Sequence, residues 1–243
     1  PPKIKFKGFF YYLKEINEQL KSNRAFVYLF SDSTFNFFIK NSIGTKGIFK
    51  SNIPWSFYSR KPKIKNHVVG FVGNARRARG FHLLPKIISL LEKKNKSLKY
   101  LIQFSKTSSD LISIKNDLII LAKKNNKIKI IEKYCDYKEF RNVLKKIDIM
   151  PIIHEAKEIN TITSGTMYSS SSHEIPVVIP EGTKFMKNIL IHKSFENAKN
   201  LNQYANKILK ISKKYKYYLK NVKLNSHLLK KILKNDPLSK NIY

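Results

Sequence analysis

The chain has 243 residues, of which 42% are hydrophobic and 12% aromatic, so it has enough apolar side chains for a folded core and is not a disordered chain. Its single cysteine, Cys135, excludes an internal disulfide, and no apolar run reaches the ~18–20 residues that a membrane-spanning helix needs. The 48 basic and 16 acidic residues give a net charge of +32, which favours anionic partners, acidic membrane surfaces included.

The lysine excess by itself does not predict nucleic-acid binding. It is spread along the chain and accompanies many asparagine and isoleucine residues, so AT-rich codons can explain it without any ligand. Nucleic acid is therefore a disfavoured partner, although a nucleic-acid or anionic-surface binding protein remains the alternative function. The sequence shows no recognisable secretion signal, and we expect a cytoplasmic protein, with peripheral contact with the inner face of the membrane as a less favoured alternative.

Residues 1–56 predict an incomplete α/β segment followed by a linker over residues 57–65. The expected elements are a helix over Phe9–Lys21, a strand over Ala25–Ser31, a helix over Thr34–Asn41 and a strand over Thr45–Ile53. Pro54 and Pro62 bracket the linker. Two strand–helix units are too few for a second complete domain.

Residues 66–193 predict a Rossmann-like α/β domain. The expected strands are His67–Val72, Leu98–Phe104, Ile128–Ile131, Ile147–Ile153 and Pro176–Ile179; the expected helices are Phe81–Lys94, Ser108–Lys124, one capped by Asp136 and Glu139, and Ser164–Ser172. Strands that alternate with helices at this spacing indicate a parallel sheet with helices on its faces. Residues 194–243 predict basic helices that pack on the sheet domains through an apolar stripe.

Arginine is distributed differently from lysine. Of the six arginines, Arg76, Arg77 and Arg79 fall within four residues, in a loop between Gly73 and Gly80. The loop follows a buried strand, and ligands of open α/β sheets bind at the carboxyl ends of strands. Glycine lets the backbone approach a phosphate, and a guanidinium offers it a planar pair of donors. The loop indicates phosphate binding, with a surface-exposed basic turn as the alternative.

A second loop, Thr161–Ser169, leads from the fourth strand into the short helix. Ser164 or Thr163 can cap this helix, which would leave the N–H groups around Gly165–Met167 as an anion site. The alternative is an ordinary cap on a serine-rich loop. A doubly wound sheet would bring this loop and the arginine loop to the same edge.

His154 follows the fourth strand and is a further candidate for contact with a ligand, although a histidine at a strand end is more often structural. The histidines show no metal-ligand spacing, and the chain has no Asp-x-Asp pair. We therefore expect neither a metal nor a cofactor.

Several stretches, in order and spacing, resemble the C-terminal donor-binding domain of GT-B glycosyltransferases, especially family 4. They are Val69–Gly73, Arg76-x-x-Arg79-Gly80, Ile147–Pro151, Ser164-Gly165 and Ile175–Thr183. The resemblance covers half of the chain. It implies that Arg76 and Arg79 occupy the positions of two basic residues that hold the donor diphosphate and stabilise it as the leaving group.

The resemblance implies hexosyl transfer, with retention and without a metal, from a nucleotide sugar to an unknown acceptor (a glycan, a lipid or a small molecule). The predicted donor-binding residues are Gly73, Arg76, Arg77, Arg79, His154, Ser164, Gly165, Thr166 and Ser169. No catalytic base is assigned. Two features depart from the family: its paired glutamates are replaced by Thr161 and Ser169, and its acceptor domain is incomplete here. A fragment and a catalytically inactive relative therefore stay open as alternatives.

Overall fold

The structure is a computed structural model that describes residues 18–19, 27–29, 35–36, 39–40, 47–50, 57–63, 65–154, 164–183 and 190–237. The chain forms two compact units. The larger unit is Trp55–Lys230, and the smaller one combines Pro1–Pro54 with Lys231–Tyr243.

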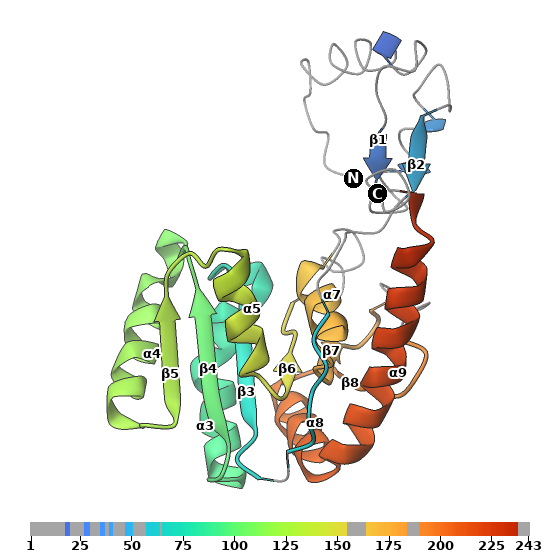
Figure 1. The fold of residues 1–243 in the computed structure, drawn as a ribbon. Helices are drawn as coiled ribbons and strands as arrows, with labels where there is room; N and C mark the ends of the chain where they lie inside the picture. The colour runs from blue at the N-terminus through green and yellow to red at the C-terminus, as the bar shows by residue number, and fades with distance from the viewer. Residues whose placement is uncertain are drawn as a thin grey trace. The chain divides into compact units, whose positions relative to one another are not determined.

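The larger unit is built on a parallel β-sheet (Figure 1). The strands are β3 (Val68–Val72), β4 (Lys99–Phe104), β5 (Ile128–Glu132), β6 (Met150–Pro151), β7 (Val177–Pro180) and β8 (Phe195–Ala198). They pair in parallel in the orders β3-β4-β5 and β6-β7-β8. A parallel bridge between Val69 and Ile149, with the Gly70 N–H donating to the Ile149 carbonyl at 2.9 Å, joins the two sets. The resulting strand order is β5-β4-β3-β6-β7-β8, with all strands parallel. Successive strands are added toward one edge from β3 to β5 and toward the other edge from β6 to β8, so the strand order reverses between β3 and β6.

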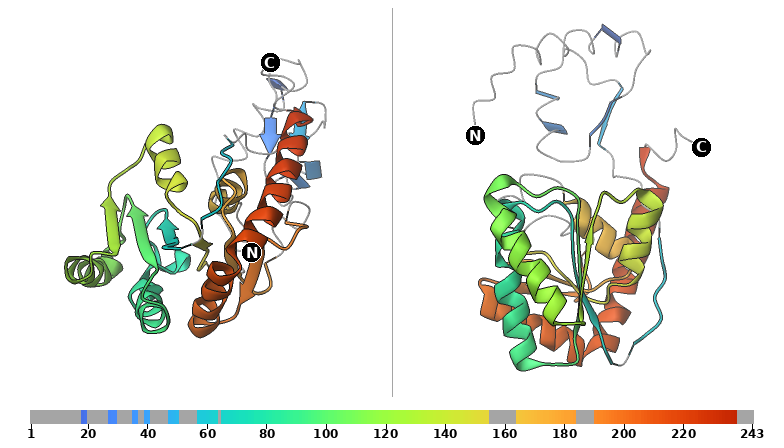
Figure 2. Two further views of the ribbon diagram at one scale, coloured as in Figure 1. Left: turned by 60° about the horizontal axis from the view of Figure 1, so that its bottom comes forward. Right: turned by 90° about the vertical axis from the view of Figure 1, so that its left-hand side faces the viewer.

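Helices cover both faces of this sheet (Figure 2). One face carries α3 (Leu84–Lys94), α4 (Ile112–Lys124) and α8 (Leu201–Lys213), and the other carries α5 (Tyr137–Lys145), α7 (Gly165–Ser172) and α9 (Tyr215–Lys234). Short 3-10 turns, Arg77–Arg79, Phe81–Leu83 and Ser109–Leu111, precede α3 and α4. The predicted α/β class with a parallel sheet is confirmed.

Local sequence explains most of these elements. The helix α3 buries Leu84, Ile87, Ile88 and Leu91, the spacing of one helical face, and carries a proline in its first turn. The predicted capping box of α5 is present, because the Asp136 side chain accepts from the Glu139 N–H at 2.7 Å.

Three predicted segments differ in the structure. The strand expected over Ile147–Ile153 is reduced to β6, although the Ile152 N–H just beyond it still donates to the Val178 carbonyl at 2.8 Å. The segment expected to be helical from Ser194 begins instead with β8, which extends the sheet. The expected linker is no free spacer, because Tyr58 donates its N–H to the Ser172 carbonyl at 3.0 Å.

In the smaller unit, β1 (Val27–Leu29) and β2 (Ile48–Lys50) pair in parallel, within the two strands predicted there. Ile48 is buried against Val27, Phe35 and Ile39. The predicted helix Phe9–Lys21 and the end of the chain lie almost wholly outside the described residues.

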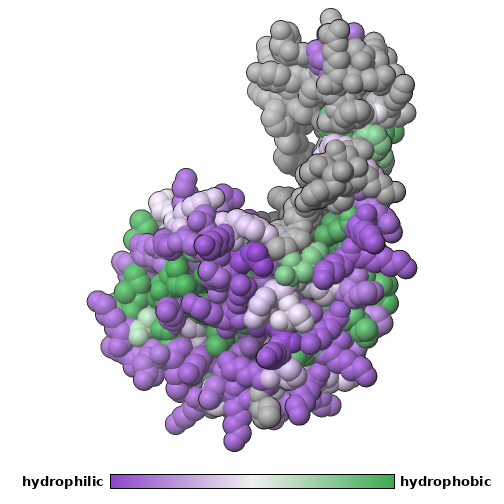
Figure 3. Space-filling model, in the orientation of Figure 1, coloured by the Kyte–Doolittle hydropathy of each residue, from purple (hydrophilic) through white to green (hydrophobic). Residues whose placement is uncertain are grey.

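The surface of the larger unit is mainly hydrophilic, with apolar patches between the charged side chains (Figure 3). Among the helices that the structure describes, none combines the length and the apolar character needed to cross a membrane.

Candidate functional site

A pocket opens where the strand order reverses, at the carboxyl ends of β3 and β6. Its polar lining comes from Gly73, Asn74 and Arg79 after β3, from Gln103 in β4, from His154 after β6, and from Thr166 in the first turn of α7. Phe71, Ile102, Met150 and Ile153 are among its apolar walls. Because ligands of open parallel sheets bind at such a reversal, this pocket is the candidate site.

Two glycines shape the loop after β3. Gly73 and Gly80 have φ angles of 119° and 71°, which glycine adopts without strain. A Cβ on Gly73 would lie 2.9 Å from Nη1 of Arg79, and a Cβ on Gly80 would lie 2.5 Å from the carbonyl oxygen of Ile153. Glycine at these positions therefore leaves room for the Arg79 side chain and lets the loop pack against the segment after β6.

The three clustered arginines have different surroundings. Arg79 is half-buried and lines the pocket. Arg77 is exposed, and its Nε pairs with the Asp110 carboxylate at 3.1 Å. Arg76 is also exposed and is not among the residues that line the pocket. Of the three, Arg79 alone lines the pocket.

His154 lies beside this charge. Burial and, to a smaller extent, the positive charge of Arg79 together lower the pKa of its imidazole to about 4. The ring is therefore neutral at pH 7. A neutral ring can donate one hydrogen bond and accept another without adding charge to the pocket.

The first turn of α7 contributes Thr166 to the lining of the pocket. Ser164 caps the helix, with its Oγ accepting from the Met167 N–H at 3.4 Å. Among the described residues, the N–H groups of Gly165 and Thr166 have no hydrogen-bond partner. Such a helix N-terminus attracts anions through its free N–H groups and its dipole.

Some predicted site residues do not face the pocket, and others were missed. Ser169 is 1% exposed, in the middle of α7, and lies outside the pocket lining. Gly73 lines the pocket, but its N–H already donates to the Gln103 carbonyl at 3.1 Å, so it contributes space and no donor. Asn74 was missed, although its position between Gly73 and the arginines was a signal.

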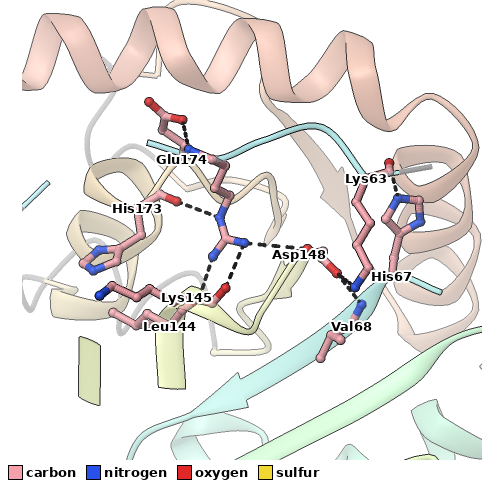
Figure 4. A network of polar contacts seen from close by, with 9 residues as sticks. Lys63, His67, Val68, Leu144, Lys145, Asp148, His173 and Glu174 are labelled. Atoms are coloured by element: carbon pink, nitrogen blue, oxygen red, sulfur yellow. Dashed lines mark hydrogen bonds and ion pairs between the residues drawn. The ribbon is translucent and has the colours of Figure 1, made fainter. Parts of the chain in front are cut away.

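The other end of α7 is held by a buried arginine that sequence analysis did not single out (Figure 4). Arg60 is 6% exposed. Its Nε donates to the His173 carbonyl at 2.8 Å and its Nη2 to the Leu144 carbonyl at 2.5 Å, at the C-terminal ends of α7 and α5. Its Nη1 lies 3.6 Å from the Asp148 carboxylate. Burial lowers the pKa of Arg60, and the nearby Tyr215 and Asp148 oppose that shift.

Asp148 and Glu174 complete this network. Asp148 accepts from Lys63 Nζ at 2.9 Å and from the Val68 N–H at 2.8 Å, and Glu174 accepts from the Arg60 N–H at 2.7 Å. The network ties the segment before β3 to α5, β6 and α7 (Figure 4). A useful signal would have been the use of arginine at residue 60 in a chain that otherwise prefers lysine.

Comparison with proteins of known structure identifies the fold. No protein-family model matches the chain, and neither does any curated protein sequence. Among solved structures, the C-terminal domain of a glycosyl transferase group 1 family protein (LpcC) from Francisella tularensis matches 72% of this chain over 94% of its own length, with 14% identity and a TM-score of 0.55. The fold is that of the GT-B C-terminal domain.

Two longer GT-B structures extend this likeness. Sucrose-phosphate synthase from Thermosynechococcus elongatus matches 91% of this chain over 57% of its own, with 11% identity and a TM-score of 0.60. Anabaena HepE, in complex with UDP and glucose, matches 95% of this chain over 66% of its own, with 12% identity and a TM-score of 0.59. The chain thus spans less than two thirds of either protein, and the likeness concerns the GT-B fold alone.

Proposed function

We propose that the pocket between β3 and β6 binds the diphosphate of a nucleotide sugar, and that the chain is a glycosyltransferase or the donor-binding part of one. The observation that carries this proposal is the pairing of Arg79 and Thr166 across one pocket. A guanidinium and a helix N-terminus both favour anions, and together they suit two linked phosphates. Neighbours of the same fold were solved with UDP and with GlcNAc or glucose, which supports this choice of ligand.

In the proposed reaction, the bond between the anomeric carbon and the diphosphate oxygen breaks, and its electron pair stays on that oxygen. The acceptor oxygen bonds to the anomeric carbon and passes its proton to a base that is left unassigned. Negative charge grows on the leaving diphosphate, where Arg79 and the N–H groups of Gly165 and Thr166 would stabilise it. His154, as a neutral ring, can hydrogen-bond to the sugar. A role for Arg76 requires its side chain to turn toward the ligand.

Finer features of the proposal come from the sequence. We propose hexosyl transfer with retention, as in family 4, in the cytoplasm and without a metal, since the chain has no Asp-x-Asp pair to bridge a metal and a diphosphate. The acceptor, its base and the donor nucleotide are left unassigned.

Thermal unfolding with a panel of nucleoside monophosphates, nucleoside diphosphates and nucleotide sugars tests the proposal. A ligand at a hundredfold excess over its Kd stabilises the folded protein by about 2.7 kcal/mol, enough to raise Tm by several degrees. We expect diphosphates and nucleotide sugars to stabilise the chain more than the matching monophosphates. The same panel with free sugars alone is the control.

Two other results would point elsewhere. Steeply salt-dependent binding of random DNA, with no stabilisation by any diphosphate, would favour the nucleic-acid alternative. Stabilisation by a nucleotide sugar without transfer or hydrolysis of its sugar would favour an inactive relative.

A further inference from the structure

The two C-terminal helices carry charge of one sign only. From Leu201 to Lys234 the sequence has ten lysines and neither an aspartate nor a glutamate. The helices α3, α4 and α5 each carry both signs, as with Glu92 and Lys93 in α3, and α7 carries no charged residue. The helices α8 and α9 therefore form the most one-sidedly basic part of the larger unit.

The helix α9 separates its buried and exposed residues cleanly. Tyr215, Tyr218, Leu219, Val222 and Leu229 are buried against the core. Between Tyr215 and Leu229 the exposed side chains, named here the basic face, are Lys216, Tyr217, Lys220, Leu224 and His227, which fall on the opposite side of the helix. In Figure 1, α9 runs along the margin of the larger unit beside β8.

The lysines of the basic face are not used to hold the fold together. Elsewhere on these helices, Lys207 and Lys210 pair with the buried Glu196 carboxylate at 2.9 and 2.7 Å, and they lower its pKa against the effect of burial. Lys216 and Lys220, by contrast, have no ion-pair partner in the part of the chain that the structure describes. Their charges are free to meet an anionic surface.

Two large apolar side chains stand exposed among these lysines. Tyr217 is 51% and Leu224 is 42% exposed. They are seven residues apart, so they lie on the same flank of the helix about two turns from each other. A phosphate backbone would use the lysines but has nothing to offer Leu224. The boundary of a bilayer can accept all of these groups, with lysines at anionic headgroups and apolar side chains just below them.

We propose that the basic face of α9 docks on an anionic lipid bilayer. We infer a bilayer as the partner because its anionic headgroups complement the lysines, and its apolar interior can accept the exposed Tyr217 and Leu224. This inference is independent of the nucleotide-sugar pocket, which lies at the carboxyl ends of β3 and β6. Docking through α9 would hold the pocket near a membrane without any spanning segment.

Sedimentation of the full chain with vesicles tests the docking. One set of vesicles contains phosphatidylcholine alone, and the other contains phosphatidylcholine mixed with phosphatidylserine. We expect binding to the mixed vesicles only. The double variant Lys216→Gln/Lys220→Gln should bind them roughly 30-fold more weakly, from the usual contribution of a lysine near an anionic surface.

Two further double variants distinguish binding through the basic face from a general effect of positive charge on vesicle binding. Lys123→Gln/Lys124→Gln makes the same charge change on exposed lysines at the end of α4, and should bind nearly as well as the parent chain. Tyr217→Ser/Leu224→Ser leaves the charge intact and should also weaken binding. Circular dichroism and Tm confirm that each variant is folded.

The proposal is overturned if the parent chain ignores the mixed vesicles, or if the α4 pair weakens binding as much as the α9 pair. It is also overturned if the serine variant binds vesicles normally while the α9 lysines prove necessary for binding duplex DNA. That last result would assign the basic face to nucleic acid.

Discussion

The two halves of the sheet differ in what lies at their cores. Around β3, β4 and β5 the buried side chains are almost all apolar, with Val69, Ile102 and Leu118 fully enclosed. The half formed by β6, β7 and β8 encloses charged groups as well: Arg60, Asp148, Glu174 and Glu196 are each at most 8% exposed. One half is held by apolar packing of neighbouring elements, whereas the other also depends on polar contacts between distant segments.

Each half contributes one side of the candidate pocket in its own way. The apolar half presents a side-chain charge, Arg79, on a loop shaped by glycine. The polar half presents backbone donors at the first turn of α7, whose other end is tied to the Arg60 network. The Arg60 network holds the C-terminal end of the same helix whose first turn carries Thr166 at the pocket, and rigid support of this kind is what keeps the groups of a site in place.

The largest effect is expected from removing the buried charge of Arg60, which the polar half encloses. Arg60→Met would leave the Asp148 carboxylate and two helix-end carbonyls without their buried partner. Losing one member of a buried pair typically costs about 3–5 kcal/mol of unfolding free energy. Urea unfolding of this variant and of Arg76→Met, which changes an exposed arginine, measures the difference. A loss below about 1 kcal/mol for Arg60→Met would show that the network is not a main support of this half.

The same contrast explains which parts of the fold could be predicted from the sequence. The apolar half was predicted element by element, because its strands and helices carry the apolar spacing that burial requires, as in Leu84, Ile87 and Leu91 of α3. The capping box of α5 was also predicted, since both of its residues lie within one turn. Such features depend on near neighbours in sequence.

The polar half was predicted less well, because its decisive contacts are long-range. The strand β8 was missed because its segment was predicted to be helical, and its buried Glu196 carboxylate is enclosed by Lys207, Lys210 and Tyr218, which lie 11 to 22 residues further along the chain. Arg60 bonds to residues 84 and 113 positions away. The two pocket loops could be placed together only through the strand order, and which of the arginines faces inward was beyond sequence reasoning.

Within the apolar half, the two arginines of one loop give a matched pair. Arg79→Ala removes the charge that lines the pocket, whereas Arg77→Ala removes an exposed charge that pairs with Asp110. Losing a preorganised contact to a developing charge typically costs ~10²–10³ in turnover, or about 2.7–4 kcal/mol. Sugar transfer, or the Kd for a nucleoside diphosphate where transfer is not seen, measures both variants. Equal effects of the two substitutions would contradict the assignment of Arg79.

The smallest expected effect comes from the first turn of α7. Ser164→Ala removes the side chain that accepts from the Met167 N–H, and the loss of a helix cap typically costs about 1 kcal/mol. Ser89→Ala is the control, because Ser89 is an exposed residue within α3, where alanine is slightly favourable. Thermal unfolding with and without a diphosphate ligand reads out both stability and binding. If α7 supplies donors to the ligand, Ser164→Ala should also lower the ligand-induced rise in Tm, since a frayed first turn no longer presents the Gly165 and Thr166 N–H groups together. An unchanged ligand-induced rise would mean that Arg79 holds the anion without help from the helix.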